Sequence, residues 1–272
     1  MERITPFKKE ISGVENEREF VRAFHEKKVK NLPILLCELV EALYGDIDRD
    51  AVVHAYHIYD KMKPDFFIVI NGVRKYISVK MGFKTSVHTE NVYDFAHFLR
   101  SIGVPSSAVE TYLRYHFADG TTNGKGETRV SSSVYKEQHQ EEIDILNEKL
   151  ACIKNIDRLL DRFLFVGKLF ARRVDAIILG IVEDNFWITP EEIKEQVLLQ
   201  MKRKTTCPRI GPFSIQPLNR CLNRNARYER ARYSVQIKWY QISDDIFKAM
   251  IIRDANCIRD EEQLLEESLP KF

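Results

Sequence analysis

Alternation of apolar and polar positions predicts a β-hairpin in the first third of the chain. Residues 66–70 are apolar and β-prone, and residues 73–79 resume that character. Between them stand Asn71 and Gly72, the pair most typical of a two-residue hairpin turn. The local pattern therefore predicts both the strands and the turn that joins them.

The same turn also predicts which side chains share a face of the hairpin. If Ile70 pairs with Val73, Asp65 lies opposite Ser78, and Lys80 follows two residues later on that face. Opposed Cβ atoms lie about 5 Å apart and diagonal ones about 7–8 Å apart. The other face is apolar with one interruption, at Lys75: Phe66, Ile68, Ile70, Val73, Ile77 and Val79. Register alone thus gathers an acid, a hydroxyl and a lysine at one place.

A helical stripe follows the hairpin. Apolar residues recur at helical spacing from Val92 to Ile102 and predict a helix over residues 88–102. Glu90 and Asp94 stand one turn apart on its other face. Either carboxylate could reach back to Asp65, and the spacing leaves the choice between them open.

Similar patterns predict the remaining elements. Helices are expected over 15–29, 32–44, 106–117, 132–150 and 153–165, and after the N-cap Thr189-Pro190. Strands are expected over 174–182 and 233–240, whereas 51–59 could be a strand or a helix. Residues 246–272 are expected to form a short acidic tail.

Composition favours a cytoplasmic protein. The five cysteines are odd in number, widely spaced and without a CxxC motif, which fits reduced thiols better than a disulfide framework or a zinc site. The N-terminus lacks the apolar run of a signal peptide. The longest apolar run, residues 176–182, is too short to span a bilayer, so no membrane partner is expected.

Charge is concentrated in one segment, which we call the basic segment, residues 201–240. It holds ten lysines and arginines against a single acid, Glu229, although the net charge of the whole chain is only +2. Arginine can grip a phosphate or a guanine edge with two hydrogen bonds. The segment is therefore expected to contact nucleic acid, a solvated or protein-binding face being the alternative, through these arginines: Arg203, Arg220, Arg224, Arg227, Arg230 and Arg232.

Pro64-Asp65 followed by Ser78-Val79-Lys80 resembles the PD-(D/E)xK phosphodiesterase superfamily, in its S-x-K variant. The resemblance covers roughly residues 15–103. It implies an α/β fold with a restriction-endonuclease-like αβββαβ core. Residues 1–182 would form this core, including a helical insertion at about 104–173, and residues 183–272 would form a basic C-terminal α+β region.

The resemblance also implies a metal site. Serine cannot supply the second carboxylate of the motif, and in the S-x-K subgroup a carboxylate from the following helix does so. Asp65 with Glu90 or Asp94 would hold Mg²⁺, Lys80 would stabilise charge on the phosphate, and Ser78 would only form hydrogen bonds. Glu19, on the first helix, is a further candidate ligand in this family. Taken singly, each of these residues is also typical of a turn, a strand edge or a helix surface.

The resemblance, together with the basic segment, implies a Mg²⁺-dependent DNA endonuclease, of the type II restriction class. Cutting both strands requires two sites, so a homodimer is expected. The alternatives are a nucleic-acid-binding protein that keeps the fold without catalysis and a nuclease that acts on RNA.

Overall fold

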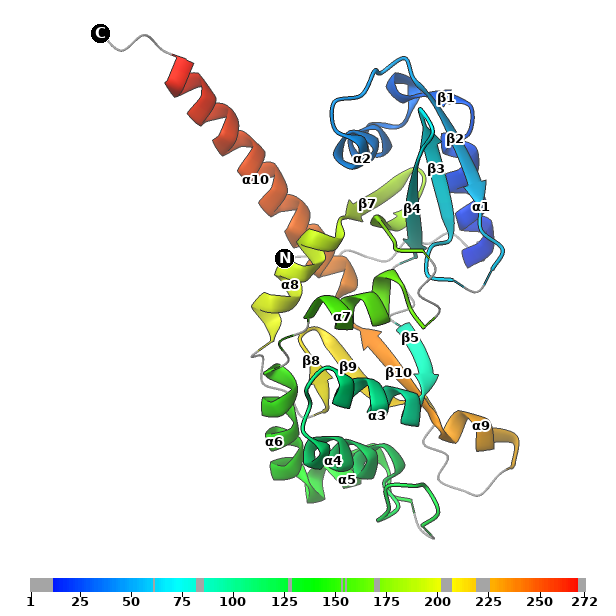
Figure 1. Cartoon of the computed structure of the whole chain (residues 1–272), viewed down its shortest axis with the longest axis vertical. Helices are drawn as coiled ribbons and strands as arrows, with labels where there is room; N and C mark the ends of the chain where they lie inside the picture. The colour runs from blue at the N-terminus through cyan, green and yellow to red at the C-terminus, as the bar shows by residue number, and fades with distance from the viewer. Residues whose placement is uncertain are drawn as a thin grey trace. The chain divides into compact units, whose positions relative to one another are not determined.

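The computed structural model places the chain in two compact units, each with its own sheet (Figure 1). Unit 1 is formed by residues 1–84, 171–196 and 242–272, and unit 2 by residues 85–170 and 197–241. The structure describes these residues: 12–60, 62–81, 86–126, 129–152, 154, 156–168, 172–201, 207–218 and 226–268.

Unit 1 contains a six-stranded mixed sheet in the order β1-β2-β3-β4-β6-β7. Neighbouring strands are antiparallel except β4 and β6, which run parallel. The strands are β1 (Lys27–Lys28), β2 (Val52–His57), β3 (Phe66–Ile70), β4 (Val73–Lys80), β6 (Ala176–Ile181) and β7 (Asp184–Ile188). The predicted strand 174–182 thus joins the sheet beside β4, and residues 51–59 form a strand rather than a helix.

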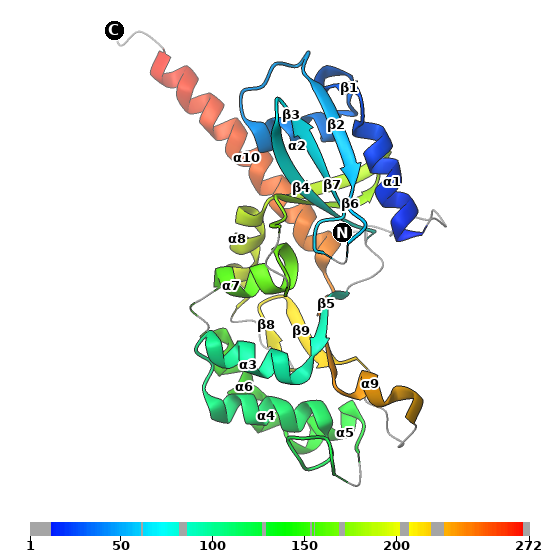
Figure 2. The ribbon, with the colours of Figure 1, turned by 45° about the vertical axis from the view of Figure 1, so that its right-hand side comes forward.

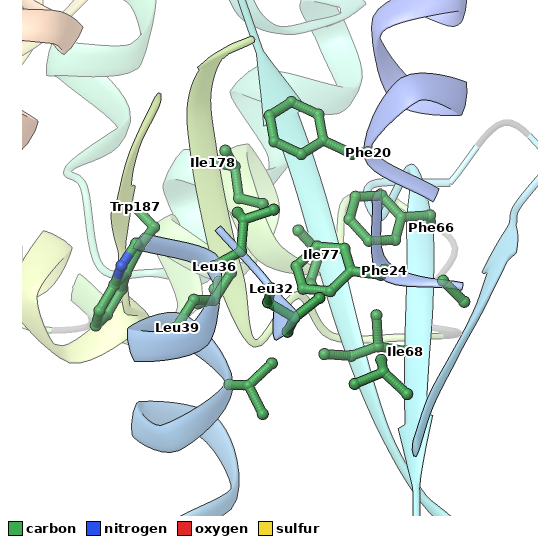
Figure 3. Packing of buried hydrophobic residues seen from close by; sticks show 14 of the residues in the cluster. Phe20, Phe24, Leu32, Leu36, Leu39, Phe66, Ile68, Ile77, Ile178 and Trp187 are labelled. Carbon is green, nitrogen blue, oxygen red and sulfur yellow. The ribbon is translucent and has the colours of Figure 1, made fainter. Parts of the chain in front are cut away.

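Helices α1 and α2 cover the apolar face of this sheet (Figures 1 and 3). Phe20 and Phe24 of α1 pack with Phe66 and Ile68 of β3, and Leu36 of α2 joins the same buried cluster. Asp65, Ser78 and Lys80 alternate with the cluster members Phe66, Ile77 and Val79, so their side chains do not belong to this cluster. The helices of unit 1 are α1 (Gly13–Phe24), the 3₁₀ turn η1 (Val29–Asn31), α2 (Ile34–Tyr44), the start of α8 (Pro190–Gln200) and α10 (Ile242–Ser268).

The predicted hairpin register is confirmed. Ile70 pairs with Val73 and Phe66 with Ile77, so the register runs unbroken from the turn to the base of the hairpin. Asn71 and Gly72 have φ angles of 51° and 81°. Both residues therefore adopt the left-handed conformation that a type I′ turn requires, which matches the twist of the two strands.

Unit 2 contains a four-stranded antiparallel sheet in the order β5-β10-β9-β8 (Figure 2). Its strands are β5 (Ser86–Asn91), β8 (Arg209–Ile210), β9 (Phe213–Pro217) and β10 (Ser234–Trp239). Helix α3 packs on β10, α4 on β9 and α6 on β8, so the helices supply the second layer of this unit. Its helices are α3 (Val92–Ser101), α4 (Ser106–Phe117), α5 (Ser132–Gln138), α6 (Gln140–Ala151), α7 (Ile156–Leu160), the π-helix η2 (Asp161–Phe165), η3 (Ala226–Tyr228) and α9 (Glu229–Arg232).

Several predicted helices differ from the structure at an end. The helix expected over 15–29 ends at Phe24, and residues 27–28 form β1. The prediction of a helix from residue 88 is wrong at its start, because residues 86–91 form β5 and pair with β10. Most of the expected acidic tail belongs to helix α10, which spans residues 242–268. Ile242, Ile246 and Ala249 are buried at helical spacing, which explains why this polar segment is helical. Among the described residues, no helix has both the length and the apolar character needed to cross a membrane.

The two units do not coincide with the predicted division at residue 182. The pairing of β5 with β10 brings residues 85–170 and 197–241 into one unit, so the segment inserted between β4 and β6 is longer than the predicted 104–173. Helix α10 packs on β7 and returns the end of the chain to unit 1.

Candidate active site

Asp65 stands at the base of the hairpin, where its main chain joins three strands. Its N–H donates to the carbonyl of Ile77, and its carbonyl accepts from the N–H of Ile58. The side chain turns toward β4, and Oδ2 accepts the N–H of Val79 at 2.6 Å. The carboxylate is thus held rigidly by the backbone of the sheet rather than by a loop.

Ser78 connects Asp65 with Lys80. The Ser78 hydroxyl donates to Asp65 Oδ2 at 2.9 Å, and Lys80 Nζ donates to Ser78 Oγ at 2.6 Å. Lys80 Nζ also donates to the carbonyl of Val79 and lies 3.5 Å from Asp65 Oδ2. Among the described residues, no hydrogen bond reaches Asp65 Oδ1, so this oxygen is the one available to a ligand. The hairpin register has therefore brought the acid, the hydroxyl and the lysine into one hydrogen-bonded network.

Helix α1 contributes a second carboxylate, Glu17. Burial and the negative charge of Asp65 together raise the pKa of Glu17, which outweighs the opposing effects of His57 and Lys80. Its Oε2 lies 3.0 Å from His57 Nε2, and the pair is mostly buried. A carboxylate whose pKa responds to Asp65 and Lys80 shares their electrostatic site.

Glu17, rather than the predicted Glu19, is the acid of α1 whose pKa responds to Asp65 and Lys80. Side chains two residues apart on a helix point about 200° apart. Glu19 accordingly lies on the other side, exposed and paired with Arg22 at 2.6 Å. The apolar stripe could have identified Glu17, since it stands three and seven residues before the buried Phe20 and Phe24, on the same face of the helix.

Glu90 and Asp94 both belong to unit 2, whereas Asp65 and Lys80 belong to unit 1. The Glu90 carboxylate is completely buried and accepts hydrogen bonds from Arg162 Nη2 at 2.6 Å and Nε at 3.3 Å, with His88 Nε2 at 3.1 Å. Burial would raise the pKa of Glu90, but the hydrogen bonds from His88 and Arg162 prevail and lower it. Asp94 is exposed and forms an ion pair with Lys168. Both carboxylates expected at the metal site are thus neutralised within unit 2.

The acidic pair Glu17–Asp65 fits Mg²⁺ better than a metal that demands many protein ligands. Mg²⁺ is commonly held by one or two carboxylates and keeps several of its waters. Burial, and after it the negative charge of Asp65, raises the pKa of Glu17, so the two carboxylates interact electrostatically. Within the described residues, no group of three or more His, Cys, Asp or Glu side chains could hold a metal ion.

The arginines of the basic segment have different surroundings. Arg227 and Arg230 are exposed. Arg232 is only 13% exposed, because it pairs with Asp119 at 3.3 Å and donates to the carbonyl of Gly124. Its guanidinium therefore stabilises the fold of unit 2, for which the sequence offered no signal. The other arginines expected to bind nucleic acid lie outside the described residues: Arg203, Arg220 and Arg224.

Comparison of the chain with protein-family models gives no match, and a search of curated proteins gives none either. The geometry of the Asp65–Ser78–Lys80 network and its neighbour Glu17 is therefore the basis for a functional proposal.

Proposed function

We propose that this chain is a Mg²⁺-dependent phosphodiesterase that hydrolyses DNA, built on a restriction-endonuclease-like core. The observation that carries the proposal is the network in which Lys80 and Asp65 share the hydroxyl of Ser78. Unit 1 supports the proposal with a helix, a three-stranded antiparallel meander and a strand parallel to β4, whereas the helices between β4 and β6 belong to unit 2.

Each residue has a distinct role in this proposal. Asp65 and Glu17 would hold Mg²⁺, which when bound polarises the scissile phosphate and lowers the pKa of a coordinated water. Lys80, beside Asp65, stabilises negative charge that develops on the phosphate. Ser78 positions both side chains, and His57 holds the Glu17 carboxylate in place. Two copies of the chain would supply one site for each strand of a duplex.

Cleavage of plasmid DNA tests the proposal. Wild-type protein should nick or linearise plasmid with Mg²⁺ and leave it intact with EDTA. Lys80→Ala should lower the rate by about 10²–10³-fold, the cost of losing one charge-stabilising group. Asp65→Ala and Glu17→Gln should lose at least as much, and Ser78→Ala about 10–100-fold, as for residues that orient metal ligands.

Glu19→Gln is the matched control, because Glu19 is an acid of the same helix whose side chain lies on the other side. At saturating DNA it should cleave like the wild type. Undiminished cleavage by Asp65→Ala or Lys80→Ala would refute the proposed site. If only Glu17→Gln cleaves normally, another residue must be the second metal ligand. Glu90→Gln and Asp94→Asn then test the ligands that the sequence predicted.

A non-catalytic nucleic-acid-binding protein on the same fold is the second candidate. The observation that favours it is the pairing of Glu90 and Asp94 with cations inside unit 2. Binding of DNA without Mg²⁺-dependent cleavage would support this candidate over the first.

A further inference from the structure

We propose that a groove between α1 and β2 binds unpaired nucleotides of the strand that is cut, an inference that rests on the proposed function. The groove has a volume of about 620 Å³, a size typical of sites for ligands as large as a nucleotide. Six of the residues that line it can contact bases or phosphates: Arg18, Arg22, His25, Tyr56, His57 and Tyr59.

Two exposed tyrosines offer ring faces in this groove. Tyr59 is 82% exposed and Tyr56 is 46% exposed, large fractions for aromatic side chains. The Tyr59 ring lies 4.7 Å from that of His57, and the Tyr56 ring stacks on Phe67 at 5.2 Å. Each ring is thus supported from one side while part of its surface faces solvent. Such rings are the surfaces on which unpaired bases stack, whereas the bases of a duplex are already stacked on one another.

Arginines supply the charge for the phosphates. Arg18 pairs with Glu15 at 3.6 Å, and Arg22 pairs with Glu15 at 3.1 Å and with Glu19 at 2.6 Å, all on the exposed surface of α1. Exposed ion pairs contribute little to stability, so a phosphate can replace the carboxylate at small cost. No acidic residue is among the described residues that line the groove, which favours an anionic ligand.

His57 connects the groove with the candidate active site. It lines the groove, and its Nε2 lies 3.0 Å from Oε2 of Glu17, the proposed metal ligand. A strand in the groove would therefore lead toward Glu17 and Asp65. Because the groove offers exposed rings for unpaired bases and cations for phosphates, it selects single-stranded or locally unpaired nucleic acid, either DNA or RNA.

Fluorescence anisotropy in EDTA tests this inference without cleavage. The probes are labelled oligo-dT, oligo-U, a duplex and an abasic oligonucleotide that keeps the phosphates but lacks bases. Wild-type protein should bind the single strands more tightly than the abasic strand. Tyr56→Leu should weaken binding of the single strands at least about fivefold and leave the abasic strand unaffected, whereas Tyr56→Phe should bind like the wild type. Comparison of the affinities for oligo-dT and oligo-U shows whether the groove prefers DNA or RNA.

Arginine variants test the phosphate contacts. Arg22→Ala should weaken binding of both the base-containing and the abasic strands. Arg49→Ala is the matched control and should leave both unchanged, because Arg49 is exposed to the same extent (66% against 63%) and is also paired with glutamate, Glu41, but lies outside the groove.

Thermal unfolding of each variant confirms that it is folded. Equal binding of abasic and base-containing strands, or single-strand binding that Tyr56→Leu leaves unchanged, would overturn the inference even if plasmid cleavage is normal. Loss of cleavage with Tyr56-dependent binding retained would instead refute only the proposed catalysis, so the two failures are distinguishable.

Discussion

At the scale of single residues, Ser78 connects an acid and a lysine through one hydroxyl group. A serine at this position cannot bind a metal as a carboxylate does, yet its hydroxyl accepts from Lys80 and donates to Asp65. The hydroxyl therefore sets the direction of both charged groups and leaves Asp65 Oδ1 open to a ligand. In the proposed site, Glu17 of helix α1 would supply the second carboxylate.

The raised pKa of Glu17 predicts a trade-off between stability and activity. A carboxyl group whose pKa is higher in the folded protein stabilises the fold at low pH, and that contribution is lost as the pH rises through the raised pKa. At neutral pH ionised Glu17 therefore destabilises unit 1. Glu17→Gln should raise the melting temperature by a few degrees at pH 7 in EDTA, and this gain should disappear below about pH 4, where both forms are neutral.

Addition of Mg²⁺ provides the complementary measurement. The ion should raise the melting temperature of the wild type, because it binds the folded state, and should leave that of Glu17→Gln nearly unchanged. Glu19→Gln should respond to Mg²⁺ like the wild type. A lower melting temperature for Glu17→Gln at pH 7 would contradict the electrostatic account of this site.

At the scale of elements, the sequence predicts correctly those strands whose pairing is determined by residues close together in the chain. The β3–β4 register follows from Asn71-Gly72, which fixes the turn without help from the rest of the chain. Strand β5 has no such signal, because its partner β10 is far away in sequence and Val235 pairs with Glu90. Because pairing with a distant strand outweighs the helical pattern, Glu90 lies in the interior of unit 2 rather than on the predicted helix surface.

The contact between β5 and the π-helix η2 should contribute strongly to stability. Arg162→Met would leave the buried Glu90 carboxylate without its closest cation, which typically costs about 3–5 kcal/mol. Because hydrogen bonds lower the pKa of Glu90 despite its burial, the stability that this pair provides is present at neutral pH and is lost as the pH falls through that lowered pKa. Denaturant unfolding at neutral and acidic pH measures both effects.

Two comparisons make this result specific. Arg49→Met breaks an exposed ion pair of unit 1 and should change stability by no more than about 1 kcal/mol. The double variant Glu90→Gln with Arg162→Met should regain most of the loss, because no uncompensated charge remains. If Glu90→Gln abolished cleavage without any change in stability, Glu90 would instead have the catalytic role that the sequence predicted.

At the scale of the whole molecule, the two proposed tasks belong to different units. The candidate catalytic residues lie in unit 1, whereas the described part of the basic segment lies in unit 2. The chain enters unit 2 after β4 and again within α8, so neither unit is continuous in sequence. A boundary drawn along the sequence could not separate them, because strand pairing between β5 and β10 decides which segments fold together.

This division predicts that variants of the basic segment alter DNA affinity and leave the chemistry of cleavage unchanged. Arg227 and Arg230 are exposed, so if each contacts a phosphate, its replacement by alanine should weaken binding about equally for all sequences. It should also flatten the dependence of log affinity on log salt by about one unit. If an arginine instead reads a guanine edge, its replacement should cost about 1–3 kcal/mol of binding free energy at one base position only.

Arg232→Ala is the control. It should leave the salt dependence unchanged and lower the stability of unit 2, because the Arg232 guanidinium is bonded to Asp119. Affinities for several duplexes from low to moderate salt, with the cleavage rate at saturating DNA, measure these effects; a salt dependence unaltered in Arg227→Ala and Arg230→Ala would assign this surface to a protein partner or to solvent.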